Sequence, residues 1–130
     1  MQRPDPIEKF MGLQVEDMTP AELAAYVKTY LLHRYDIELP MDGVIERKTF
    51  EAFKRRYPDG KAGRIVQWVM MHHHGRRDGE YVSSSLFSAK MKWWTDKMFM
   101  ELQHEQHRVE RTEVGGDKLR AAFSDAGSMA

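Results

Sequence analysis

The side chains of this sequence that could do chemistry are mostly cations, and they gather in one part of the chain. Residues 47–77 hold nine lysines and arginines and two acidic residues, a net charge of +7, although the 130-residue chain as a whole has no net charge. Clustered lysines and arginines are the groups that contact nucleic-acid phosphates, so we predict nucleic-acid binding here. The residues expected to make these contacts flank one tight turn and two helix ends: Lys54, Arg55, Arg56, Lys61, Arg64, Arg76 and Arg77.

A largely apolar segment, residues 60–75, lies among these cations. It opens with Gly60-Lys61-Ala62-Gly63, and glycines at the start of a helix would let a phosphate approach the backbone N–H groups. The spacing differs from the Gly-x-x-x-x-Gly-Lys-Ser/Thr of a P-loop, so we expect no nucleotide hydrolysis. Besides Arg64, only Gln67 is an obvious polar residue for reading base edges. We therefore expect contacts to phosphates more than to bases.

The same cations also admit a purely structural interpretation. Residues 1–46 hold four lysines and arginines and nine acidic residues, a net charge of −5. The basic residues would then form a solvated face that complements the C-terminal dipole of a helix over 45–57 and pairs with the acidic N-terminal third.

The histidines and carboxylates do not form a recognisable metal or catalytic set. Successive positions of a helix diverge by about 100°, so His72, His73 and His74 cannot all converge on one ion. Glu101 and His104 have the spacing used in di-iron helical bundles, but the second motif and the further carboxylates are missing. We expect no metal, no cofactor and no enzymatic activity.

Two further places could bind a partner. Trp93 stands beside lysines and next to Trp94, so it could stack on a base or enter a partner's pocket, or it could pack under a loop. After Gly115-Gly116, Leu119 and Phe123 are four residues apart, as in a helical docking peptide. The alternative is that this tail folds back on the chain's own apolar surface.

The apolar pattern predicts an all-α fold with four helices. The capping box Thr19-Pro20-Ala21-Glu22 begins a helix that should end near Arg34. The next helices are expected at 45–57 and 61–73, and the turn between them gives a helix-turn-helix-like centre. Asp78-Gly79 then predicts either a short β-hairpin (a wing) or an ordered loop within residues 76–83.

The fourth helix should begin after Ser85, as its N-cap, and bury one continuous seam. The seam residues are Phe87, Met91, Trp94, Met98 and Leu102. Residues 103–113 are almost wholly polar, so we expect the last turns to project into solvent.

These elements divide the chain into three parts. We expect an extended lead-in at 1–18 with one helical turn near 7–11, a helical domain at 19–113, and a flexible tail at 114–130 with a short amphipathic helix. The chain has no cysteine, no apolar stretch long enough for a bilayer and no apolar signal segment at its N-terminus. We therefore expect a cytoplasmic location and no membrane contact.

Two functions follow from these observations. The first is a small, non-enzymatic nucleic-acid-binding accessory protein of the replication or transcription type. The alternative is a structural, assembly or adaptor protein, such as a phage-type virion component. In that case the acidic residues 1–46 and the basic residues 47–77 would pair with neighbouring copies or with another protein.

Overall fold

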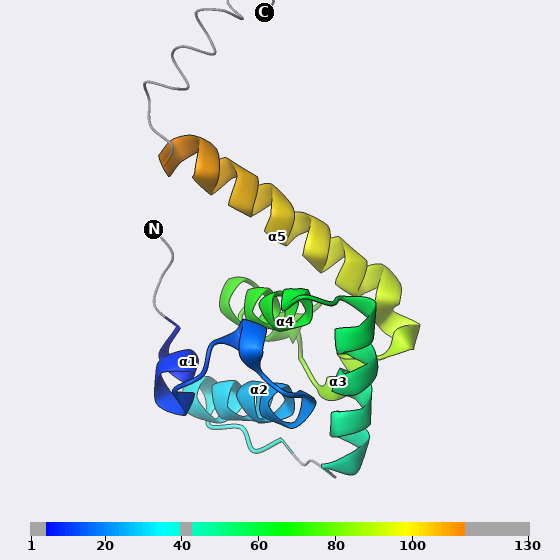
Figure 1. Ribbon diagram of the computed structural model, residues 1–130. Helices are drawn as coiled ribbons and strands as arrows, with labels where there is room; N and C mark the ends of the chain where they lie inside the picture. The colour runs from blue at the N-terminus through cyan, green and yellow to red at the C-terminus, as the bar shows by residue number, and fades with distance from the viewer. Residues whose placement is uncertain (1–4, 40–42, 114–130) are drawn as a thin grey trace, which may run out of the picture.

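The computed structural model describes residues 5–39 and 43–113, with side chains to Arg108, and the chain folds into a mostly helical body. Within these residues there are five α-helices, one more than predicted (Figure 1). They are α1 (Pro6–Met11), α2 (Pro20–Tyr35), α3 (Val44–Arg56), α4 (Lys61–His72) and α5 (Lys92–Glu113). Three 3-10 helices connect them: η1 (Val15–Asp17), η2 (Ser84–Phe87) and η3 (Ala89–Met91).

The start of α2 follows directly from its sequence. The Thr19 hydroxyl accepts a hydrogen bond from the Glu22 backbone N–H at 3.2 Å, and the Glu22 carboxylate accepts one from the Thr19 N–H at 2.9 Å. The predicted capping box is therefore confirmed, with proline at the first helical position.

Helix α4 is the centre of the body. It contacts η1, α2, α3 and α5, and in Figure 1 it lies below α5, above α2 and beside the upper end of α3. Its residues Ile65, Val66, Val69 and Met70 are fully buried. The middle of the apolar segment 60–75 therefore lies in the core.

Helix α3 contributes an aromatic face to the same core. Phe50, Phe53 and Tyr57 are buried. The ring of Phe87, from η2, packs 5.3 Å from Phe50 and 5.2 Å from Phe53, between ring centroids. The segment between α4 and α5 is thereby anchored on α3.

Residues 5–18 do not form the predicted extended lead-in. They form α1 and η1, and Ile7, Val15 and Met18 lie in the core. The expected helical turn is present, but the segment as a whole is folded onto α2 and α4. Its apolar residues are spread over a six-residue helix, a loop and a 3-10 turn, so they show no single periodicity along the sequence.

The predicted hairpin is confirmed over the alternative of an ordered loop. Strands β1 (Arg76–Arg77) and β2 (Glu80–Tyr81) pair antiparallel. Asp78 and Gly79 connect them with positive φ angles of 50° and 85°, as the short turns typical of hairpins require.

The last helix begins later than predicted. Ser85 does not cap it, because residues 84–91 form η2 and η3 and α5 starts only at Lys92. The seam is otherwise as expected: Phe87, Trp94, Met98 and Leu102 are buried, and Met91 is half-buried. The last turns of α5, to Glu113, extend away from the rest of the body (Figure 1). The predicted tail, with Leu119 and Phe123, lies outside the described residues.

Candidate functional site

The glycines at the start of α4 serve packing, which corrects the expected phosphate cradle. A Cβ added at Gly63 would lie 2.0 Å from the Val15 carbonyl oxygen, and one at Gly60 would lie 2.9 Å from the Glu16 Cβ. Segment η1 therefore crosses directly over the beginning of α4. It also brings an acidic side chain there, since the Glu16 carboxylate is 3.9 Å from the Arg64 Nε. An anion would meet this carboxylate at the helix start.

Two other cations of the predicted set contact the chain's own backbone. Lys54 Nζ donates a hydrogen bond to the Met18 carbonyl at 2.7 Å, and Arg56 Nη2 donates to the Phe87 carbonyl at 2.8 Å. Both side chains are half-buried, whereas Arg55 and Lys61 are exposed. The structure therefore separates the predicted basic residues into internal connectors and surface cations.

Gln67, the obvious polar candidate for reading a base edge besides Arg64, is engaged within the chain. Its Nε2 donates to the Asp5 carboxylate and to the Glu8 carboxylate, each at 2.9 Å. Tyr26 donates to the same Asp5 carboxylate at 2.5 Å, and burial together with this hydrogen bond raises the pKa of Tyr26 well above its ordinary value. This cluster connects α1, α2 and α4 and uses both N–H donors of the glutamine amide.

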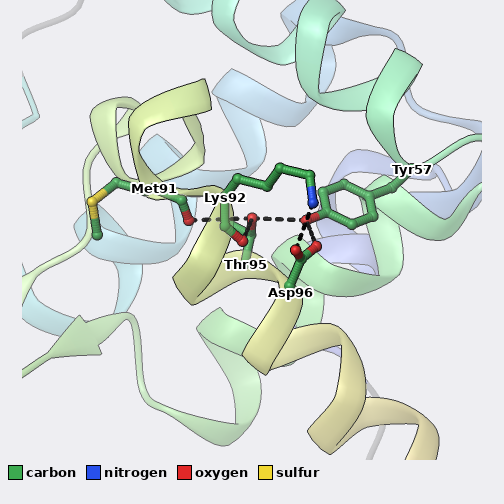
Figure 2. Close-up of polar contacts among 5 residues, drawn as sticks. All are labelled: Tyr57, Met91, Lys92, Thr95 and Asp96. Atoms are coloured by element: carbon green, nitrogen blue, oxygen red, sulfur yellow. Dashed lines mark hydrogen bonds and ion pairs between the residues drawn. The ribbon is translucent and has the colours of Figure 1, made fainter.

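A second polar cluster fixes the start of α5 against the end of α3 (Figure 2). The Tyr57 hydroxyl lies 2.9 Å from the Thr95 hydroxyl and donates to the Asp96 carboxylate. Lys92 Nζ donates to the other Asp96 oxygen at 2.7 Å. The hydrogen bonds from Lys92 and Tyr57 hold the pKa of Asp96 below its ordinary value. Only the i, i+4 spacing of Lys92 and Asp96 signals this cluster in the sequence.

The hairpin carries an exposed arginine on an aromatic ring. The Arg76 guanidinium lies over the Tyr81 ring, 4.8 Å from its centroid, and donates to the Gly79 carbonyl at 2.9 Å. The Tyr81 ring meets the edge of Tyr35 at 5.0 Å, and the Tyr35 hydroxyl donates to the His74 carbonyl at 2.6 Å. The hairpin is thereby held against the end of α2.

Arg77 makes the equivalent contact with the start of α5. Its guanidinium lies 5.1 Å from the Trp93 ring centroid and 5.9 Å from that of Trp94. It also lies 3.7 Å from the Asp78 carboxylate, which is 83% exposed. Three of the predicted functional residues therefore lie on or beside the hairpin: Arg76 and Arg77 on β1, and Trp93 on α5. We call the set Tyr35, Arg76, Arg77, Tyr81 and Trp93 the wing surface; Arg76 and Tyr81 lie on one face of the hairpin, and Arg77 and Trp93 on the other.

Sequence reasoning missed both tyrosines of the wing surface. Tyr81 follows Asp78-Gly79 at hairpin spacing, and its register opposite Arg76 would have been a usable signal. Tyr35 is 46 positions from Tyr81 along the chain, and no local pattern connects them.

His73 contacts another helix, whereas His72 packs within α4. His73 Nε2 lies 2.8 Å from a Glu101 carboxylate oxygen, and the His72 ring stacks on Trp68 with centroids 3.9 Å apart. Across residues 5–39 and 43–108, no three histidine or carboxylate side chains converge as a metal site requires. In the helices that the structure describes, length and apolar character are nowhere sufficient to span a bilayer.

Comparison of the chain with models of known protein families, with curated proteins and with solved structures found no match.

Proposed function

We propose that this chain is a small, non-enzymatic nucleic-acid-binding accessory protein, of the replication or transcription type, that contacts phosphates at the wing surface. The observation that carries the proposal is the pair of arginines on the hairpin, each lying over an exposed ring. The Tyr81 side chain is 43% exposed and the Trp93 side chain 58%. Alternating cations and exposed rings are typical of nucleic-acid contact surfaces.

Stacking prepares the two arginines for this role. A guanidinium that lies over a ring keeps its N–H donors in its own plane, where they remain able to reach phosphate oxygens. The ring also restricts the side chain to one region, so less conformational entropy is lost on binding. The Asp78 carboxylate would compete with a phosphate for Arg77. It is largely exposed and lies 3.7 Å from the guanidinium, so this ion pair is weak.

The predicted basic residues are expected to contribute unequally to binding. Arg76 and Arg77 are the centre of the proposed contact, and Arg55 and Lys61 add exposed charge elsewhere. Lys54 and Arg56 contribute less, because both are half-buried and each donates to a backbone carbonyl of another segment. The order of α3, a turn, α4 and a hairpin is that of a winged helix-turn-helix, yet α4 is enclosed by its neighbours. We therefore assign the contact to the hairpin and not to α4.

The test compares two charge-matched double variants. Fluorescence anisotropy with labelled oligonucleotides would be measured between roughly 50 and 200 mM salt. Arg76→Gln with Arg77→Gln should weaken binding roughly tenfold or more, because charge-assisted hydrogen bonds to phosphate are lost. Arg55→Gln with Lys61→Gln removes the same charge elsewhere and should weaken it less.

Two results would overturn the proposal. One is the absence of binding by the wild-type chain at low salt, or binding that salt does not weaken. The other is an equal loss in both double variants, because the contact would then be spread over the molecule and not centred on the hairpin.

An assembly or adaptor role remains the second candidate, and one observation favours it. Trp93 and Met100 are seven residues apart on α5, so they share a face, and Met100 is 63% exposed. The predicted head-to-tail pairing of acidic and basic parts is less favoured, because Glu16 and Arg64 already meet within one chain. Light scattering over a concentration series tests this role: Met100→Ser should abolish a concentration-dependent mass, and a constant monomer mass would exclude self-assembly.

A further inference from the structure

We infer that the nucleic acid bound at the wing surface is single-stranded, and that Trp93 is the platform on which one of its bases stacks. This inference rests on the proposed function and adds the class of ligand and a residue that determines specificity.

Trp93 is presented to solvent from a fixed position. Its neighbour Trp94 is only 5% exposed, because adjacent helical positions diverge by about 100° and one of the pair fills the core. The turn of α5 that carries both rings is fixed by the contacts of Tyr57 with Thr95 and Asp96 (Figure 2). A rigidly positioned ring loses little entropy when a base stacks on it.

Arg77 makes the same position suitable for a nucleotide. Its guanidinium lies over the Trp93 ring, so the cation and the indole form one unit in which a phosphate contact and a base contact stand side by side. Trp93 is 58% exposed, and stacking of a base on an indole tolerates any base. On the other side of the hairpin, Arg76 and Tyr81 repeat the pairing of a cation with an exposed ring.

A duplex fits this surface poorly. In a duplex the faces of the bases are covered by their neighbours, so an exposed indole has no base face to stack on. Reading a duplex in the major groove requires a helix or a two-stranded ribbon. Helix α4 is enclosed and its Gln67 side chain is occupied. Each strand of the hairpin has two residues, about 7 Å of chain, which is short against a groove about 12 Å wide.

The test measures single strands and duplexes in parallel with three variants. Anisotropy titrations would use a pyrimidine single strand as DNA, the same strand as RNA, and a DNA duplex of equal length. Trp93→Leu should weaken single-strand binding roughly tenfold or more and leave any duplex binding unchanged. Trp93→Phe should retain most of the affinity because it keeps a ring. Met100→Ala, on the same face of α5, should have no effect.

The outcomes separate this inference from the proposed function. If the duplex binds as tightly as the single strands, or Trp93→Leu binds like the wild type, the inference is overturned. Sensitivity to the Arg76 and Arg77 double variant would then still support the proposed function. If no oligonucleotide binds at low salt, both fail. Comparison of the DNA and RNA strands identifies which single strand is preferred, because only RNA carries the 2′-hydroxyl.

Discussion

The hydroxyl of Tyr57 makes polar contacts between the C-terminal end of α3 and the start of α5. It contacts Thr95, whose side chain is fully buried, and the carboxylate of Asp96 (Figure 2). Tyr57→Phe keeps the ring in the aromatic core and removes both contacts. We expect a loss of about 1–3 kcal/mol in the free energy of unfolding, measured by urea denaturation.

Tyr81→Phe is the matched control for this change. Its ring is exposed on the hairpin, and substitutions of exposed groups usually change stability by less than about 0.5 kcal/mol. Equal effects of the two substitutions would contradict the structural role of the Tyr57 hydroxyl.

Asp96 makes part of this stability depend on pH. Hydrogen bonds from Lys92 and Tyr57 lower its pKa in the folded chain below the ordinary value of 3.8. A carboxyl with a depressed folded pKa stabilises the fold fully above its unfolded pKa, and the stability is lost as the pH falls through the folded pKa. The difference in unfolding free energy between the wild type and Asp96→Asn should therefore be constant near neutral pH and shrink below about pH 4. A difference that stays constant down to pH 2 would refute this role.

At the scale of elements, helix propensity and the contact between η1 and α4 have opposite effects on a substitution at Gly63. Alanine is better than glycine in a helix by about 1 kcal/mol, so propensity alone predicts that Gly63→Ala stabilises the chain. The added Cβ would instead lie 2.0 Å from the Val15 carbonyl oxygen, which is backbone and cannot move aside freely. We expect net destabilisation of about 1–3 kcal/mol, seen as a lower thermal midpoint. A raised midpoint would show that η1 is not held against α4.

The elements that were predicted well are those with strong local signals. The capping box located α2, the apolar seam gave the buried face of α5, and Asp78-Gly79 gave the hairpin turn. The start of α5 was misplaced because Ser85 has the chemistry of an N-cap while its segment forms 3-10 turns that place Phe87 between Phe50 and Phe53. Tertiary packing decided that boundary, and no local pattern reveals it.

At the scale of the whole molecule, the segregation of charge has an internal use. Arg64 reaches Glu16, and Lys54 reaches the carbonyl of Met18, so the acidic and basic parts of the sequence meet within the chain. Carbonyl partners such as those of Met18 and Phe87 cannot be identified from residue types. This is why the sequence predicted a basic surface but not which of its cations remain at the surface.

The sequence did indicate Arg76, Arg77 and Trp93 as candidates, but as two separate sites. Trp93 comes close to Arg77 because η2 and η3 return the chain from the hairpin to α3 before α5 begins. Trp93 was already the more exposed candidate of its pair, since Trp94 fell on the apolar seam. The two tyrosines of the wing surface, Tyr35 and Tyr81, were identified only from the structure.

The projection of α5 beyond the body implies that one continuous helix has two rates of amide hydrogen exchange. As far as Leu102 its backbone is protected by burial against α4, η2 and η3, and opening it requires opening the core. The last turns, to Glu113, project from the body (Figure 1), and an isolated helix of that length is marginal in water. Exchange measured by mass spectrometry should therefore be slow at 94–102 and faster by orders of magnitude at 109–113. Uniform slow exchange along α5 in a monomer would contradict this division, and a partner that covers the projecting turns would be recognised by the protection it adds there.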